Sequence, residues 1–380
     1  VAGDNFAYVA QYTTGFWYGD LQARDIDLST GALSATVSWS AKTQLQGKVS
    51  TASDTRTIYT YSSAATNKLK TFVSANLTSE KSANYFKSSS SNPNGALSQY
   101  VLLTATEQGQ ATDDNMINFI RGQSGYENEA GNTYKIFRDR QYALGDIVDA
   151  SPVFVKKPPF KYTDAGYASF VTTNASRTPM VYVGANDGML HAFNAATGTE
   201  AWAYIPSMVI PYLYKLADAS YANNHRFYVD GQITIGDAYD GTDWKTILIG
   251  GLGGGGKGFY ALDITNPSSL KALWEFNESS DGDMGYSYGN PILTKRNSDG
   301  KWVVLVTSGY NNTGGDSKGR LFVLDAFTGA RLSEIKTDNA VTDPNVSGIG
   351  KINNYVLNTL TDNTTQYVYG GDLGGSLWRF

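Results

Sequence analysis

The sequence predicts an all-β fold, namely a β-propeller with short helical and loop insertions. Tyrosine and glycine are frequent, with 26 Tyr and 40 Gly among 380 residues, and this composition favours strands joined by tight turns. A unit of two apolar strands and a turn recurs along the chain, and a tryptophan follows the turn in several copies. One small sheet of this kind cannot bury both faces alone. The units must therefore stack, and closing them into a ring protects the sheet edges.

The repeat itself supports this prediction in detail. One copy ends in the turn Asn194-Ala-Ala-Thr-Gly198 and a later one in Asp325-Ala-Phe-Thr-Gly329. Asp and Asn side chains cap the backbone of such turns, while Gly accepts a positive φ. The clear copies span 180–202, 246–274, 303–329 and 366–380, and an echo at 23–39 predicts an early blade. We expect seven blades, with six or eight as alternatives. The competing architecture, an open β-solenoid, would need a shorter and more regular period.

Two stretches depart from the repeat and are expected to be insertions. Residues 79–140 are polar and contain a helix-like segment at 113–121, for which Asp113 or Asp114 is the expected N-cap. Residues 206–226 carry apolar residues near helical spacing. Residues 1–380 as a whole are expected to form a single propeller domain, as a fragment of a longer protein. Because loops usually carry function, we expect partner contacts at 79–140.

Composition excludes several classes of function. Lys and Arg number 30 against 35 Asp and Glu, so the net charge of −5 lacks the basic footprint of a nucleic-acid binder. The absence of cysteine excludes disulfides and thiolate chemistry. No apolar window is long enough to predict a transmembrane segment.

Motifs that suggest an enzyme have structural interpretations that fit better. Gly251–Lys257 nearly fits a phosphate-binding loop, but Gly258 follows and a strand, not a helix, is expected next. Ser287 lies in a Gly-x-Ser-x-Gly pattern that is followed by an expected strand, whereas a nucleophile elbow requires a helix there. His191 and His225 lack metal-ligand spacing. We therefore predict no catalytic residues and no bound cofactor.

Calcium is the one metal for which the sequence offers candidates. Asp281, Asp283 and Asp362 could supply hard oxygen ligands. Neither segment has carboxylates at alternating positions followed by a bidentate acid, so solvated loop carboxylates are the favoured interpretation.

Several segments resemble the PilY/PilC family of type IV pilus proteins. Leu144-Gly-Asp-Ile-Val-Asp-Ala-Ser-Pro-Val153 resembles the family's leucine-glycine-aspartate motif, and four further segments match in order: 183–193, 250–263, 273–276 and 371–380. The resemblance is firm from about Gly145 to the end and weaker before it. Many family members carry an Asp-rich calcium loop just before the Gly-Asp-Leu-x-Gly strand; here that stretch, 360–367, has Asp362 as its single Asp.

The resemblance implies an exported, non-enzymatic protein at the cell surface or pilus tip. Such a protein promotes type IV pilus assembly and twitching motility, opposes retraction and attaches the cell to surfaces as an adhesin. Its expected partners are minor pilins and the pilus tip, and a host or abiotic surface. Calcium control through the family loop is in doubt, because residues 360–367 lack alternating carboxylates.

An alternative is a quinoprotein dehydrogenase dependent on pyrroloquinoline quinone. Ala192–Trp202 resembles the tryptophan-docking repeat of those propellers. That repeat is a packing device without chemistry, so it supports the fold more than the activity.

Overall fold

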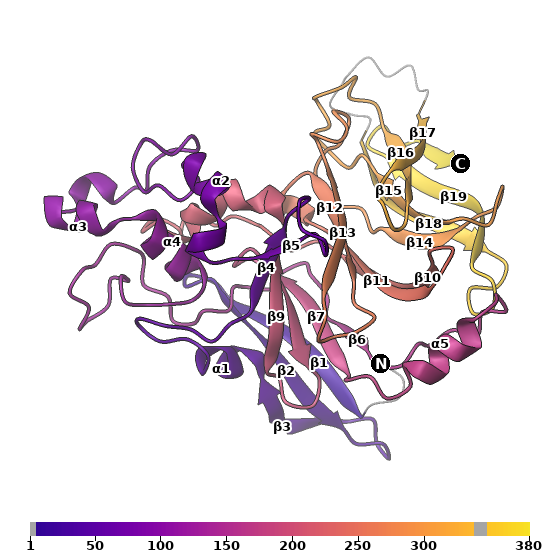
Figure 1. Ribbon diagram of the computed structural model, residues 1–380, viewed down its shortest axis with the longest axis horizontal. Helices are drawn as coiled ribbons and strands as arrows, with labels where there is room; N and C mark the ends of the chain where they lie inside the picture. Colours follow the sequence, from indigo (N-terminus) through magenta and orange to yellow (C-terminus); the bar gives the residue numbers. More distant parts are fainter. Residues whose placement is uncertain (1–4, 338–347) are drawn as a thin grey trace. The chain divides into compact units, whose positions relative to one another are not determined.

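The computed structural model describes residues 5–337 and 348–380, and most of its regular structure is β-strand (Figure 1). The chain divides into two compact units. The first comprises Val1–Thr60, Lys70–Phe154 and Met180–Val229, and the second comprises Tyr61–Leu69, Val155–Pro179 and Asp230–Phe380. The mainly β architecture agrees with the sequence prediction. The number of blades and the single-propeller organisation stay predictions.

The first unit is built mainly from two sheets. One is an antiparallel sheet in the order β1-β2-β3. The other has the order β5-β4-β9-β8-β7-β6, in which β4 pairs parallel with β9. Their strands are β1 (Phe6–Thr13), β2 (Tyr18–Ile26), β3 (Leu33–Ser40), β4 (Ile58–Tyr61), β5 (Leu69–Thr71), β6 (Val153–Val155), β7 (Met180–Ala185), β8 (Met189–Asn194) and β9 (Glu200–Ile205). The predicted early blade therefore corresponds to β1–β3, and the copy at 180–202 corresponds to β7–β9.

The second unit also contains two sheets. The first is an antiparallel meander, β10-β11-β12-β13, and the second has the order β17-β16-β15-β14-β19-β18, with β20 paired to β19. A short parallel pairing of β14 with β19 joins two halves of the second sheet. The strands are β10 (Ile233–Tyr239), β11 (Trp244–Gly251), β12 (Gly258–Asp263), β13 (Lys271–Asn277), β14 (Ile292–Arg296), β15 (Trp302–Thr307), β16 (Arg320–Asp325), β17 (Arg331–Lys336), β18 (Ile349–Val356), β19 (Thr364–Asp372) and β20 (Leu377–Arg379).

Helical segments are short and connect the strands. In the first unit α4 packs against η3, which joins the two predicted insertions. The helical elements are α1 (Ala41–Gln46), η1 (Ser74–Asn76), α2 (Thr78–Ser82), η2 (Tyr100–Leu102), α3 (Ala105–Gln110), α4 (Asp113–Ile120), α5 (Tyr167–Thr173), η3 (Ser207–Ala217) and η4 (Gly253–Gly255). Figure 1 shows α2, α3 and α4 gathered together in the first unit.

The expected helix at 113–121 is present, but its N-cap differs from the prediction. Thr112, not Asp113 or Asp114, caps α4, because its hydroxyl accepts a hydrogen bond from the backbone N–H of Asn115 at 3.2 Å. The two aspartates occupy the first helical turn, where their charges interact favourably with the helix dipole. The expectation of helical spacing in the second insertion is met by the 3₁₀ segment η3.

Strands β15 and β16 show why these sheets stack. Val304 and Phe322 join one apolar cluster, together with Phe259 and Trp274 from the β10–β13 sheet. Their immediate neighbours Val303, Leu305, Leu321 and Val323 join a second cluster with Ile349, Ile352 and Val368. Successive side chains of a strand point to opposite faces, so β15 and β16 are buried in apolar contacts on both faces. This is the two-sided burial that the repeat predicts.

The predicted turns form as the sequence indicates. In the turn at 325–329 the Asp325 carboxylate accepts hydrogen bonds from the backbone N–H groups of Phe327 and Thr328, both at 3.0 Å. Gly329 closes the turn by donating to the Asp325 carbonyl and has a φ of +70°. The turns at 27–31 and 194–198 close in the same way, with Gly31 and Gly198 also at positive φ.

Tryptophans pack on these turns. Within the second unit, the Trp274 indole N–H donates to the Ala326 carbonyl at 3.0 Å, and its ring lies where a Cβ on Gly329 would be. Within the first unit, Trp39 donates in the same way to the Ala195 carbonyl at 2.9 Å and covers Gly198. Glycine is therefore required twice over at these turns, for its positive φ and for its missing side chain. The expectation that an aromatic packs on a neighbouring repeat is confirmed in both units.

Among residues 5–337 and 348–380, no helix has the length and apolar character needed to cross a membrane.

Candidate functional site

The leucine-glycine-aspartate motif contacts the most recognisable strand pair of the first unit. The Gly145 N–H donates to the Asp187 carboxylate at 3.1 Å, and Asn186 donates to the Asp146 carboxylate at 2.8 Å. A Cβ on Gly145 would lie 2.3 Å from the backbone nitrogen of Asp187. His225, from the second insertion, contacts the same Oδ2 atom of Asp146 at 2.9 Å. These four residues of the two motifs, Gly145, Asp146, Asn186 and Asp187, are called the motif cluster below.

Behind the motif cluster lies a buried charged network centred on His191. Its ring nitrogens contact Asp187 at 3.1 Å and Glu200 at 2.8 Å. Glu200 also pairs with Arg56 at 2.9 Å, and both of these side chains are inaccessible to solvent. Burial alone would lower the pKa of His191, but the two carboxylates outweigh it and raise that pKa to about 9. The network therefore holds the histidine charged between its partners.

The motifs that resembled enzyme sites have structural roles. The Ser287 hydroxyl is buried, accepts from the backbone N–H of Leu252 at 2.9 Å and donates to the Gly256 carbonyl at 3.3 Å. The glycine run after Leu252 forms the short η4 turn and leads into strand β12. Ser287 and the glycine run therefore stabilise each other. This agrees with the structural interpretation of the Gly251–Lys257 run and of the Gly-x-Ser-x-Gly pattern.

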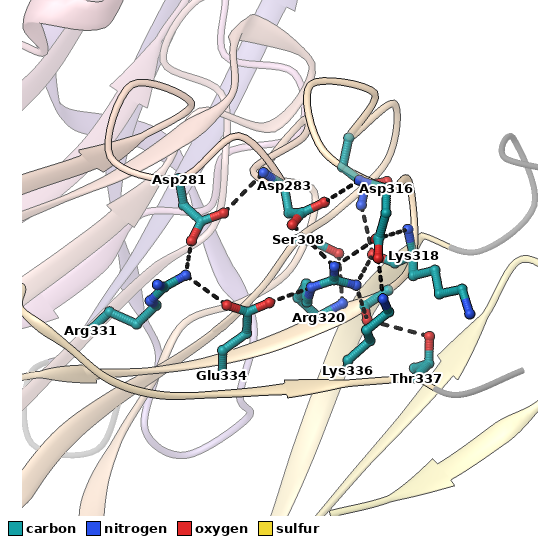
Figure 2. A network of polar contacts seen from close by, with 12 residues as sticks. Asp281, Asp283, Ser308, Asp316, Lys318, Arg320, Arg331, Glu334, Lys336 and Thr337 are labelled. Atoms are coloured by element: carbon teal, nitrogen blue, oxygen red, sulfur yellow. Dashed lines mark hydrogen bonds and ion pairs between the residues drawn. The ribbon is translucent and has the colours of Figure 1, made fainter.

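Two of the three calcium candidates belong to one cluster in the second unit, shown in Figure 2. Arg320, at the start of β16, lies at its centre with a side chain that is 4% exposed. Its guanidinium pairs with Asp283 at 3.1 Å, with Asp316 at 2.6 Å and with Glu334. This group, with its outer members, is called the Arg320 cluster below; the full set is Asp281, Asp283, Asp316, Arg320, Arg331, Glu334 and Lys336.

The remaining charges of the Arg320 cluster are paired as well. Arg331 bridges Asp281 and Glu334, and Lys336 pairs with Asp316. Burial raises the pKa of the Asp283 carboxyl, and Arg320 opposes that rise. Burial also acts on Asp316, but hydrogen bonds from Lys336, Lys318 and Arg320 outweigh it and lower its pKa. Guanidinium and ammonium groups thus pair with each of these carboxylates in the structure.

One further group of carboxylates could offer oxygens to a cation. Glu127, Glu129 and Asp139 bring one oxygen each within 4.8 Å of one another in the first insertion. Glu127 already accepts two hydrogen bonds from the Arg140 side chain. Burial and the two negative neighbours raise the pKa of Glu129.

Comparison with known proteins shows which family shares these motifs. A family profile described as the PilY1 beta-propeller domain matches residues 144–380. The chain belongs to this family. The match begins at Leu144, the first residue of the leucine-glycine-aspartate motif, so the resemblance inferred from the motifs is confirmed.

Individual PilY1 proteins are similar over nearly the whole chain. The type IV pilus biogenesis factor PilY1 of Pseudomonas aeruginosa strain UCBPP-PA14 is 34% identical over 376 residues, covering 96% of this chain and 29% of that protein. A PilY1 homologue of Xylella fastidiosa strain Temecula1 is 36% identical, covering 98% and 27%. The crystal structure of the Pseudomonas aeruginosa PilY1 C-terminal domain matches with 34% identity and a TM-score of 0.49, covering 60% of this chain and 44% of that one. The chain spans less than a third of the length of these two curated PilY1 relatives.

The third calcium candidate lies in the stretch where PilY1-family proteins are expected to carry a calcium loop. Asp362 pairs with Lys295 at 2.7 Å and accepts from the Thr364 hydroxyl at 2.9 Å. The hydrogen bond from Lys295 lowers the pKa of Asp362. Asp164 contacts the same ammonium at 3.1 Å. Asp281 and Asp283 therefore belong to one cluster, and Asp362 belongs to a separate group of ion pairs. Calcium binding at any of these three residues stays a prediction.

Sequence reasoning missed the residues that complete both charged clusters of this PilY1 domain. Arg56 and Glu200 are 144 positions apart, and Arg56 belongs to no motif. Arg320 falls inside a recognised repeat, but a single arginine at a strand start carries no signal of its own. The available signal was the glutamate that opens the otherwise apolar strand β9, since a buried Glu needs a positive partner.

Proposed function

We propose that this chain is a non-enzymatic interaction domain of a type IV pilus biogenesis factor, and that it supports pilus assembly, twitching motility and surface attachment as a pilus-associated adhesin. The observation that carries the proposal is membership of the PilY1 beta-propeller family over residues 144–380. The relatives that are similar over nearly the whole chain are named as pilus biogenesis factors. The motif cluster supports it further, because the family motifs contact each other there.

The proposed partners are minor pilins, the pilus tip and a host or abiotic surface, and the proposed location is the outside of the cell. The insertion at 79–140 is the proposed contact region. Within it, Val101 and Leu102 of η2 are 79% and 82% exposed. Large apolar side chains exposed side by side on a short turn favour burial against another molecule.

The assembly role is tested in the source bacterium after deletion of the gene. The full-length gene is supplied back either unchanged or with Gly145→Val or Gly109→Val. The Gly145 variant places a side chain against Asp187, whereas a Cβ on Gly109 meets nothing within 4 Å. We expect lost surface pili and lost twitching with Gly145→Val and near-normal values with Gly109→Val. Normal pili in the deletion strain itself would refute the assembly role.

The contact role of the insertion is tested separately, in strains that make normal amounts of the protein. The double change Val101→Ser with Leu102→Ser is compared with Leu28→Ser, because Leu28 is 76% exposed but lies outside the insertion. We expect attachment or piliation to fall in the double variant alone. Equal behaviour of both variants would remove the insertion from the proposed contact region.

The non-enzymatic part of the proposal is tested against the quinoprotein alternative. Trp39 and Trp274, which follow the turns of their repeats as Trp202 does in its own, pack on turns of other repeats, which is a structural role. Purified protein supplied with pyrroloquinoline quinone and calcium is expected to show no dye-linked dehydrogenase signal with primary alcohols. A turnover signal that depends on the quinone would overturn this part.

A further inference from the structure

A polar pocket of about 500 Å³ lies between the two insertions of the first unit. The loop around Asn94 supplies one wall, and η3 with the following segment to Arg226 supplies the rest. The insertions are tied together around it. Asn94 donates to the Pro211 carbonyl at 3.0 Å, the Tyr214 hydroxyl donates to the Asn94 carbonyl, and Ser98 donates to Asp218. The pocket walls are thus held by hydrogen bonds from both sides.

Two cations on this pocket lack a negative partner. The Arg226 guanidinium stacks on the Tyr212 ring at 4.1 Å and faces Tyr228 at 5.7 Å. Its Nε is buried and has no hydrogen-bond partner among residues 5–337 and 348–380. Lys215, whose ammonium lies 6.0 Å from the Tyr214 ring, likewise forms no ion pair within the part of the chain that the structure describes. A guanidinium that lies over aromatic rings can still donate from its edge to an oxyanion.

The other charged groups on the pocket are already engaged. Asp218 accepts from the backbone and hydroxyl of Ser98 and from those of Ser220. These donors outweigh burial and lower the pKa of Asp218, so it stays ionised and its oxygens are occupied. His225 is directed to Asp146 at 2.9 Å. Arg226 and Lys215 carry two positive charges and Asp218 carries one negative charge, so the pocket has a net charge of +1. A ligand with one negative charge neutralises the pocket, whereas a ligand with two would make it negative.

We propose that this pocket binds a carboxylate, with Arg226 as the main ligand and Lys215 as the second. The carboxylate is carried either by a small free acid or by the C-terminus of a peptide, since the same chemistry recognises both. The side chains of Tyr214 and Tyr221 line the pocket but are each 1% exposed, so the charged and polar groups supply the surface that a ligand would meet. The proposal concerns binding alone and does not depend on the role in pilus assembly.

The test uses matched pairs of probes on the purified chain. N-acetylglycine is compared with N-acetylglycinamide, and an acetylated tetra-alanine with a free C-terminus is compared with its amide. We expect both acids to bind, with a Kd on the order of 1 mM for the small acid, and both amides to show no saturable binding by calorimetry. Tighter binding of the peptide acid identifies a peptide terminus as the source, and equal binding identifies a free acid.

Variants then assign the binding to the pocket. Arg226→Gln should weaken binding roughly tenfold or more, because a charge-assisted bidentate contact is lost. Arg226→Lys should retain part of the affinity for the acids. If Arg226→Gln does not fold, Lys215→Gln serves as the test variant and should also weaken binding. Lys42→Gln is the control, since Lys42 also stacks on a tyrosine ring, at 4.3 Å from Tyr142, but lies outside the pocket. No binding of either acid, tighter binding of inorganic phosphate, or equal binding by all variants would overturn the proposal.

Discussion

Replacing Arg320 by methionine tests whether the protein's own guanidinium acts as the cation of the Arg320 cluster. Methionine keeps an apolar stem in place, so the change removes mainly the charge. It leaves Asp283, Asp316 and Glu334 facing one another without the group that pairs with all three. Removing one partner of a fully buried ion pair costs about 3–5 kcal/mol. The Asp316 and Glu334 side chains are 40% and 26% exposed, so solvent screens part of the repulsion, and we expect a loss of about 2–3 kcal/mol at pH 7.

The matched control is Arg296→Met. Arg296 pairs with Asp299 at 2.5 Å, but the two side chains are 32% and 42% exposed. A surface pair of this kind contributes about 0.5 kcal/mol or less. The free energy of unfolding is measured by urea titration with tryptophan fluorescence. A loss in Arg320→Met no larger than that in Arg296→Met would refute the reasoning.

The pH dependence gives a second and independent check. In the unchanged protein the lowered pKa of Asp316 means that its pairing stabilises the fold above the ordinary carboxyl pKa, and that this contribution is lost as pH falls through the lowered value. Asp283, with its raised pKa, acts in the opposite direction and favours the protonated form in the folded state. In Arg320→Met the Asp283 carboxyl has lost its cation, while Asp316 and Glu334 keep only Lys336 and Arg331, so the pKa values of these carboxyl groups should rise. The deficit of the variant should therefore shrink as pH falls from 7 to about 4.

Calcium completes this test. With the guanidinium removed, the carboxylates of the Arg320 cluster surround a position suited to a hard cation. We expect 1 mM calcium to raise the urea midpoint of Arg320→Met and to change that of the unchanged protein much less, with magnesium as the comparison ion. An equal response of the two proteins would show that calcium acts elsewhere.

Two further predictions concern the buried histidine and the tryptophan-covered turns. The His191 pKa is raised from its ordinary value to about 9, so the contribution of the charged histidine to stability is complete below pH 6.5 and is lost as pH rises through 9. The urea midpoint should therefore fall between these two pH values. The fall should be absent in His191→Gln. Gly329→Ala and Gly300→Ala both place alanine at a φ near +70°, but only Gly329 is covered by Trp274, with an added Cβ 2.6 Å from the ring. Gly300→Ala should cost about 1 kcal/mol and Gly329→Ala at least 1 kcal/mol more. Parallel pH profiles in the first case, or equal losses in the second, would contradict the respective explanation.

Local features of this fold were predictable because their causes lie within a few residues. The Asp325 turn needs an acceptor side chain, a short spacer and a glycine at positive φ, and all three are adjacent in the sequence. The helix at 113–121 was predictable from its spacing, but its cap was not. Thr112 and Asp113 are both good N-cap residues, and only the backbone geometry of the preceding loop decides between them.

The charged clusters were not predictable because their members meet only in the folded state. His191 looked like an isolated histidine in an apolar strand, and its partner Glu200 lies on the next strand at a register that the sequence does not specify. Asp281 and Asp283 were recognisable as possible ligands of a cation. The sequence does not show that these carboxylates lie next to Arg320. Their contact depends on how β16 and the preceding loop are placed in the fold.

The docking of Trp39 has a consequence for the order of folding. Its hydrogen bond to Ala195 joins positions that are 156 residues apart. As the chain is synthesised, β1–β3 can pair locally, but Trp39 can dock only after the turn at 194–198 has appeared. Contacts at such long separation require a costly loop closure and are slow to form. During that interval the Trp39 indole is uncovered, and a chaperone that shields it would raise the yield of folded protein.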